Sequence, residues 1–205
     1  MSPSNRMSLS IDSELTETWR KPPGIFVIAQ VGGAAGEAIR EIQLRFDPKL
    51  ANALPPHVTL AGSSGVGPID AATPPARLRE LLGPICAATP PLSLPLQRPM
   101  RFMQRDIVVL PLDPHGAIRA LHEQIARSGL TFGRVKFSFT PHVTLSFYRT
   151  LTPATLRALL AVVIDEPLLI DSIRCSLTDE PSPPRALLDL PLLGSPQLPM
   201  TEQSR

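Results

Sequence analysis

The sequence predicts a duplicated fold that mixes strands and helices, with two similar halves related by a pseudo-two-fold axis. The pentapeptide Pro-His-Val-Thr-Leu occurs twice, at Pro56–Leu60 and at Pro141–Leu145. The elements expected around the two copies follow one order: a strand, a helix, the pentapeptide strand, a helix and a strand. The copies lie 85 residues apart, from His57 to His142. A duplication explains these observations and places the functional site where the two copies meet.

Hydrophobic periodicity and turn residues define the elements of the first half. An apolar, β-rich run closed by Gly32-Gly33 indicates a strand, and apolar residues spaced three and four apart indicate helices. Proline pairs mark the places where the periodicity changes. The predicted elements are a strand at Ile25–Val31, a helix at Ala35–Phe46, the first pentapeptide strand, a helix at Pro75–Ala87 capped by Thr73, and a strand at Leu92–Gln97.

The second half repeats this order and adds a strand at its end. Gly129 is a typical stop for a helix, and Thr152 followed by Pro153 is a typical start. The predicted elements are a strand at Ile107–Leu112, a helix at Ala117–Ser128, the second pentapeptide strand, a helix from Thr152 to about Ile164, and strands at Leu168–Leu177 and Arg185–Leu192.

Composition limits the class of protein. A chain of 205 residues, 43% hydrophobic and 19% charged, suits one globular domain. No apolar run approaches the ~20 residues that cross a bilayer, and the N-terminus lacks the apolar core of a secretion signal. The two cysteines lack metal-ligand spacing and are typical of buried thiols in a reducing compartment. We therefore expect a cytoplasmic monomer that does not bind membranes. A net charge of +2 neither demands nor excludes nucleic acid.

Each pentapeptide pairs a histidine with a threonine two residues later. A strand places such residues on one face, so His57 lies beside Thr59, and His142 beside Thr144, while the apolar residues between them point into a core. Two such strands side by side supply two imidazoles and two hydroxyls around one point. Histidine exchanges protons near neutral pH, and hydroxyls stabilise charge on oxygen. The pattern predicts catalytic acid–base chemistry on a phosphate, without a metal or another cofactor.

Other histidines and the loop before the second motif carry weaker signals. His115 and His122 lie in or near a helix among charged residues, which predicts a solvated helix face, and no zinc spacing links them to the motifs. The loop at Thr131–Phe139 mixes cations with aromatic rings, a composition suited to a phosphate and a stacked base. The alternative is that its phenylalanines are core and its cations solvated. The candidate substrate-binding residues in this loop are Arg134, Lys136 and Phe139.

The two motifs and their context resemble the 2H phosphoesterase superfamily, in particular its bacterial branch called 2′-5′ RNA ligase or RNA 2′,3′-cyclic phosphodiesterase. The resemblance covers roughly Gly24 to Leu192. It rests on Phe26–Ala29 in the first strand, on the first pentapeptide, and on Phe139–Leu145. The Gly-rich segment at Ala61–Gly67 differs from the arginine-bearing continuation that the family carries there.

The resemblance implies a duplicated, bilobal α+β fold of the LigT type, with two antiparallel sheets flanking a central cleft and helices outside. The domain would span residues 23–192, with repeats at about 24–105 and 106–192 and tails at 1–22 and 193–205. The implied activity is a metal-independent hydrolase, a cyclic phosphodiesterase that opens 2′,3′-cyclic phosphate ends of RNA or nucleotides and can run in reverse as a 2′-5′ ligase. Phe26 would stack on a base.

Two other functions stay open from the sequence. The same fold and motifs can serve an enzyme for 2′-5′-linked oligonucleotides, cyclic dinucleotides or ADP-ribose cyclic phosphate, because the residues around the motifs choose the substrate. The chain can also be an RNA- or phosphate-binding module without turnover. The presence of both histidines and both threonines argues against this second alternative, because arginine and lysine serve pure phosphate binding better.

Overall fold

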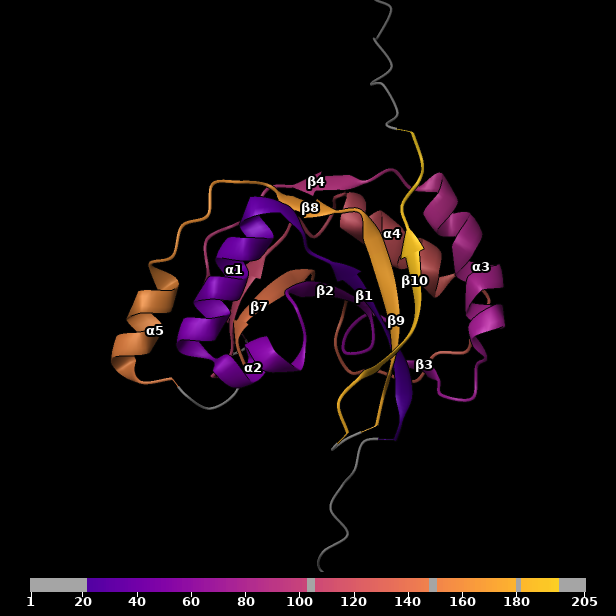
Figure 1. The fold of residues 1–205 in the computed structure, drawn as a ribbon, viewed down its shortest axis with the longest axis horizontal. Coiled ribbons are helices and arrows are strands. Elements are labelled where there is room, and N and C mark those ends of the chain that lie inside the picture. The colour runs from indigo at the N-terminus through magenta and orange to yellow at the C-terminus, as the bar shows by residue number, and fades with distance from the viewer. Residues whose placement is uncertain (1–21, 103–105, 148–150, 180–181, 196–205) are drawn as a thin grey trace, which may run out of the picture.

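An antiparallel sheet of eight strands carries the fold (Figure 1). Its strands run in the order β10-β9-β1-β2-β7-β6-β5, with β3 paired to β1, and a separate two-stranded sheet pairs β4 with β8. The computed structural model describes residues 22–102, 106–147, 151–179 and 182–195. Helices are interspersed among strands that pair antiparallel, so the predicted α+β class is confirmed.

The elements of the two halves follow the predicted order. The first half consists of β1 (Gly24–Gln30), α1 (Gly33–Phe46), α2 (Pro48–Ala53), β2 (His57–Ala61), β3 (Ile69–Asp70), α3 (Pro75–Ala88) and β4 (Leu92–Leu94). β5 (Met100–Arg101) ends the first half and pairs with the first strand of the second. The second half consists of β6 (Val108–Pro111), α4 (Ala117–Ala126), β7 (His142–Ser146), α5 (Pro153–Leu160), β8 (Leu168–Ile170), β9 (Ser172–Thr178) and β10 (Arg185–Pro191).

The two pentapeptide strands meet at the centre of the sheet. β2 and β7 pair antiparallel with Val58 opposite Val143. On the outer side of each strand the pairing is equivalent, because Gln30 of β1 lies opposite His57 and Pro111 of β6 lies opposite His142. The pseudo-two-fold axis therefore passes between the two valines, as the repeat predicts.

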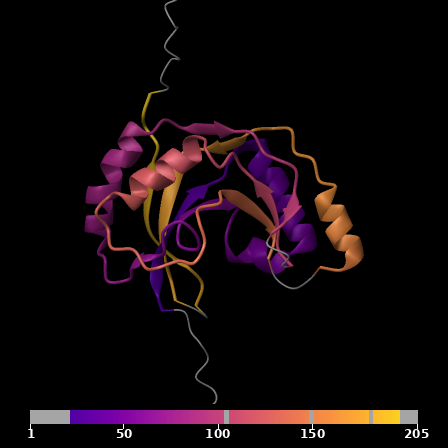
Figure 2. The same ribbon diagram turned by 180° about the vertical axis from the view of Figure 1, so that it is seen from behind.

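The helices pack on the sheet across the two halves of the sequence. α1 from the first half packs against β7 and β8, whereas α4 from the second half packs against β2. α3 lies on β9 and β10, and α5 on β6. Figures 1 and 2 show the result from opposite sides: α1, α2 and α5 gather at one end with β7, and α3 and α4 at the other with β9 and β10. Each pentapeptide strand is thus covered by a helix from the opposite half.

The core is formed by the alternate apolar residues of the central strands and by one stripe of each helix. Side chains with no exposed surface come from every layer: Ile25, Val27 and Ala29 of β1, Val58 and Leu60 of β2, Val143 and Leu145 of β7, Ile39 of α1, Leu78 and Leu82 of α3, and Ile125 of α4. Burying a side chain of this size stabilises the fold by roughly 1.5–3 kcal/mol. The alternation leaves the other residues of β2 and β7 on the opposite face of the sheet.

Some predicted boundaries are wrong. The single strand expected at Leu168–Leu177 is two strands, because β8 pairs with β4 in the small sheet and β9 pairs with β1 in the large one. β-rich sequence stands on both sides of the Asp171-Ser172 pair, so periodicity alone cannot show the change of sheet. The helix α2 and the two-residue strands β3 and β5 were not predicted, since they are too short to carry a period.

Of the two threonines predicted to cap helices, one does and the other does not. Thr152 caps α5 as expected, since its hydroxyl accepts a hydrogen bond from the N–H of Thr155 and the Thr155 hydroxyl accepts one from the N–H of Thr152. Thr73 does not cap α3, because Pro74 occupies the cap position and no side-chain hydrogen bond is made there. The tails predicted at 1–22 and 193–205 lie mostly outside the described residues, which begin at 22 and end at 195. Within the described ranges, no helix has the length and apolar character to cross a bilayer.

Two loops beside the motif strands are bonded to each other through their backbones. The N–H of Gly67 donates to Gly133 O at 3.0 Å, the N–H of Gly133 donates to Pro68 O at 2.8 Å, and the N–H of Gly65 donates to Phe137 O at 2.9 Å. A Cβ on Gly67 would lie 2.4 Å from Gly133 O, closer than any stable contact. Glycine at this position is therefore required by the approach of the second loop.

Replacing Gly67 by alanine tests this close approach. We expect Gly67→Ala to lower stability by about 1–3 kcal/mol, or Tm by roughly 2–10 °C, because the loops must separate. Gly32→Ser is the matched control, since nothing lies within 4 Å of its Cβ and serine suits the start of α1. Thermal unfolding followed by circular dichroism gives both values. An unchanged Tm in Gly67→Ala would contradict the packing described here.

Candidate active site

The side chains of the two motifs alternate between the core and one face of the sheet. β2 and β7 share one burial pattern, with the first and third residues half-buried and the others buried. The valines and leucines of the motifs are the fully buried members. We call the opposite side the motif face, and it carries His57, Thr59, His142 and Thr144.

The register of the two strands determines how these four side chains meet. Val58 lies directly opposite Val143, and the strands are antiparallel. The next pair on each side of the valines therefore joins the histidine of one motif with the threonine of the other, His57 with Thr144 and Thr59 with His142. Neighbours across an antiparallel pair have Cβ atoms ~5 Å apart. The sheet thus brings both motifs together, as the sequence predicted.

Both histidines are held in the same tautomer. Nδ1 of His57 lies 2.8 Å from the carbonyl oxygen of Pro55, and Nδ1 of His142 lies 2.7 Å from that of Thr140. A carbonyl oxygen only accepts, so each Nδ1 carries the proton and donates it. In the neutral ring the second nitrogen, Nε2, is then a free base. In each motif Nε2 is therefore the ring nitrogen left free by the carbonyl bond.

Burial lowers the pKa of both imidazoles below the ordinary value of 6.5, against the opposing effect of the two carbonyl bonds. The positive charge of His142 lowers the pKa of His57 further. The two rings are therefore close enough for the charge of one to act on the other. Loss of hydration favours the neutral ring, so an anion between the two histidines would offset the cost of charging one of them.

The surroundings of the two histidines differ and break the pseudo-symmetry. His57 lies opposite Gln30, whose amide is within 3.1 Å of the Ser172 hydroxyl. His142 lies opposite Pro111, and its ring centroid is 4.9 Å from that of Phe102. One histidine therefore has a polar amide beside it and the other has apolar neighbours. The sequence did not reveal Gln30 or Phe102, because both depend on strand register.

Phe26 lies on the motif face, and its ring rests on a glycine. It is two residues from Ile28, which pairs with Thr59. A Cβ on Gly62 would lie 2.2 Å from the Phe26 ring, and Gly62 has φ +150°. The Gly-rich segment after the first motif thus leaves room for this aromatic ring. Phe26 is half-buried, so part of it stays open to solvent.

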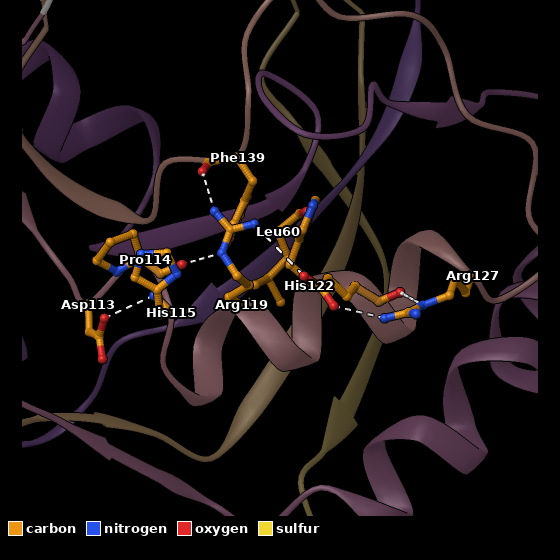
Figure 3. A network of polar contacts seen from close by, with 9 residues as sticks. Leu60, Asp113, Pro114, His115, Arg119, His122, Arg127 and Phe139 are labelled. Atoms are coloured by element: carbon orange, nitrogen blue, oxygen red, sulfur yellow. Dashed lines mark hydrogen bonds and ion pairs between the residues drawn. The ribbon is translucent and has the colours of Figure 1, made fainter.

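Of the candidate substrate-binding residues in the loop at Thr131–Phe139, one is buried in the core and two lie on the surface. Phe139 is 4% exposed and stacks on His122, with ring centroids 3.7 Å apart and planes at 1°, so its ring is used in packing. Arg134 and Lys136 are exposed. The expectation of a solvated His122 is wrong, since it is 5% exposed and bonded to the carbonyl of Leu60 (Figure 3). Its apolar neighbours come from distant segments, which the helix sequence alone does not show.

The motif face also carries an ion pair that the sequence did not indicate. Arg174 of β9 lies opposite Ile28 of β1, in the same row of the sheet as Thr59. Its guanidinium donates two hydrogen bonds to Asp189, at 2.7 and 3.0 Å. Metal ligands form no cluster in the described residues: nowhere in them do three His, Cys, Asp or Glu side chains meet in a group that could hold an ion.

Comparison with known proteins agrees with this architecture. The family model described as the 2'-5' RNA ligase superfamily matches residues 32–180. Comparison with curated proteins found no significant match.

Solved structures share the fold at low sequence identity. TT0787 of Thermus thermophilus is 15% identical with a TM-score of 0.61, and the match covers 83% of this chain and 98% of that one. LigT of E. coli complexed with 3'-AMP is 15% identical with a TM-score of 0.50, covering 84% and 99%. LigT in its apo form is 19% identical with a TM-score of 0.50, covering 82% and 97%. The implied LigT-type fold is thereby confirmed.

The family model covers more than half of the chain, and the two His-x-Thr strands that it includes meet on one face of the sheet. The chain therefore belongs to the 2'-5' RNA ligase superfamily, a group of 2H phosphoesterases.

Proposed function

We propose that the protein is a metal-independent phosphodiesterase that opens 2′,3′-cyclic phosphate ends of RNA or nucleotides. The observation that supports this most is the pairing of Val58 with Val143, which sets the two motifs side by side on one face. The Nδ1 bonds of both histidines add to it, because they leave two Nε2 atoms for proton exchange. Family membership supports phosphodiesterase chemistry in general terms.

The reaction needs one base and one acid. Nε2 of the neutral histidine accepts a proton from water as the water oxygen bonds to phosphorus. The protonated histidine donates its Nε2 proton to the ribose oxygen as the P–O bond on the opposite side breaks. The products are a phosphate monoester and a free ribose hydroxyl. Thr59 and Thr144 donate hydrogen bonds to the non-bridging oxygens, where negative charge increases in the transition state.

The nucleoside part of the substrate would use the aromatic ring nearest the motifs. Phe26 stands on the motif face with a half-buried ring, which suits stacking against a base. The exposed cations Arg134 and Lys136 would contribute to attraction of the phosphate backbone. E. coli LigT, which shares the fold, was solved with 3'-AMP, and this supports a nucleotide substrate here.

A panel of substrates tests the proposal. Wild-type protein is incubated with EDTA and with 2′,3′-cyclic nucleotides, RNA ending in a 2′,3′-cyclic phosphate, 2′-5′-linked dinucleotides, cyclic dinucleotides and ADP-ribose cyclic phosphate. Chromatography then separates 2′- from 3′-phosphate products. We expect turnover of the 2′,3′-cyclic phosphates at undiminished rate in EDTA, since acid, base and oxyanion donors are all side chains. Loss of activity on chelation, restored by Mg²⁺ or Mn²⁺, would contradict the mechanism.

Substitution of the motif residues separates catalysis from binding. His57→Ala and His142→Ala should each lower kcat by ~10²–10⁴ with little change in KM, and the double variant should be little worse than the weaker single. Thr59→Val and Thr144→Val should each lower kcat by ~10- to 10³-fold, since each substitution removes one hydrogen-bond donor to the phosphate oxygens. His115→Ala is the control, because this histidine is exposed. Weaker substrate binding with normal kcat would instead identify the protein as a phosphate-binding module.

The pH dependence of activity follows from the lowered pKa values. Below both macroscopic pKa values both imidazoles are charged and no base remains, and above both no acid remains. Because burial lowers both pKa values from 6.5, the plot of kcat/KM against pH should be bell-shaped, with its maximum below pH 6.5. The maximum of kcat should lie at higher pH, since bound phosphate favours the charged form of both rings. Steady-state kinetics across the range measures both, and a maximum of kcat/KM above neutral pH would exclude this pairing.

A further inference from the structure

Outside the motifs, one buried histidine is bonded to a motif strand. His122 of α4 places Nδ1 2.7 Å from the carbonyl oxygen of Leu60 in β2, so Nδ1 donates to it. Leu60 is the extra residue of a bulge, because β1 pairs with β2 on both sides of it but leaves it without a partner. At the bulge, Leu60 has no partner residue in β1, and its carbonyl oxygen accepts a hydrogen bond from the His122 imidazole instead.

His122 is held by close packing against Phe139 and Gly65. One face stacks on Phe139 at 3.7 Å, and Arg119 lies over the same phenylalanine with its guanidinium carbon 5.5 Å from the ring centroid (Figure 3). A guanidinium nitrogen of Arg119 also donates to Phe139 O at 3.0 Å. Gly65 lies against the edge of the stacked pair, since a Cβ there would be 2.4 Å from Cε1 of His122 and 2.9 Å from Cβ of Phe139. These contacts hold the imidazole in place for its bond to the Leu60 carbonyl.

A buried glutamine makes the corresponding bond to the other motif strand. Gln43 of α1 is 3% exposed, and its Nε2 donates to the carbonyl oxygen of Thr144 at 2.7 Å. Thr144 lies directly before Leu145, the bulged residue in the pairing of β7 with β6. Both bonds therefore act at or next to a bulge beside a motif threonine, and each comes from a helix of the opposite half.

The glutamine makes this bond at a cost in stability. Among the described residues, its Oε1 is a buried side-chain oxygen with no hydrogen-bond partner. A buried acceptor without a partner destabilises the fold, and an apolar side chain of the same shape avoids that loss. Helix packing by itself gives no reason for an amide at this position. The hydrogen bond from Gln43 to the Thr144 carbonyl gives such a reason.

We infer that Gln43 and His122 are positioning residues, which hold the two motif strands in the register that catalysis requires. His122 sets the backbone at Leu60 and so orients Thr59 and His57. Gln43 sets the backbone at Thr144 and so orients its hydroxyl and His142. The inference rests on the proposed function of the motifs, and it adds two residues that touch no substrate. A displacement of ~1 Å at a reacting group can cost 10²-fold in rate.

Gln43→Leu separates positioning from stability. Leucine removes the unpaired Oε1, which stabilises the fold, and takes the donor from the Thr144 carbonyl, which destabilises it; the two effects oppose each other, so Tm should stay within a few degrees of wild type. We expect kcat to fall by ~10- to 100-fold while KM changes less than about 2-fold. Ile39→Val is the control in the same helix, since it removes one buried methylene and no side-chain hydrogen bond. An unchanged kcat in Gln43→Leu would overturn the inference.

His122 allows a test by rescue. His122→Leu removes the donor, whereas the amide nitrogen of His122→Asn can take the place of Nδ1 and donate to Leu60. We expect kcat to fall by ~10- to 100-fold in the leucine variant and to recover largely in the asparagine variant, with KM similar in both. Ile125→Val in α4 controls for loss of packing, and assays run well below each Tm. Equal kcat in the leucine and asparagine variants, or an equal fall in the control, would contradict positioning.

A measurement that does not depend on enzymatic activity tests positioning separately from the proposed function. The Cε1–H signals of His57 and His142 are followed by proton NMR, with and without inorganic phosphate. Gln43→Leu should move the His142 signal more than that of His57, and His122→Leu should do the reverse. If no diester is hydrolysed but the signals move in this crossed pattern, the proposed function fails and positioning stands. Signals unmoved in both variants would overturn positioning by themselves.

Discussion

The pairing of β2 with β7 is the contact on which the site depends. Val58 lies opposite Val143, and both are fully buried. Because side chains alternate along a strand, burying the two valines forces both histidines and both threonines onto the opposite face. A shift of one residue in either strand would turn its histidine into the core. The hydrophobic effect therefore fixes the register, and the register brings the four motif side chains together.

The duplication explains how two equivalent histidines arise, but the acid–base cycle proposed above needs one to be neutral while the other is protonated. The equivalent carbonyl bonds at Nδ1 give both rings the same tautomer. The neighbours differ, with the Gln30 amide opposite His57 and the Phe102 ring near His142. Burial lowers the pKa of both rings, and the charge of one lowers that of the other, so the pair holds its first proton more easily than its second.

The crossed packing of the helices ties the halves into one unit. α1 packs on β7 and α4 packs on β2, so neither half can form its motif strand environment alone. The polar contacts follow the same crossing, from Gln43 to Thr144 and from His122 to Leu60. Asp47, after α1, also crosses, accepting a hydrogen bond from the N–H of Phe147 at 2.7 Å. Motif geometry and folding are therefore coupled, because separating the halves would break the contacts that hold both strands.

The sequence by itself determined the duplication, the order of the main elements and the four motif residues. These follow from local patterns: the repeated pentapeptide, the alternation of its apolar residues and the helical spacing between its copies. Only the tertiary structure decided what depends on register and on contacts between distant segments. It separated β8 from β9, placed Gln30 and Phe102 beside the histidines, and moved His122 from an expected solvated face to a buried bond with Leu60. It also placed Phe139 in the packing against His122, because a ring in a loop gives no sign in the sequence of which surface it will meet.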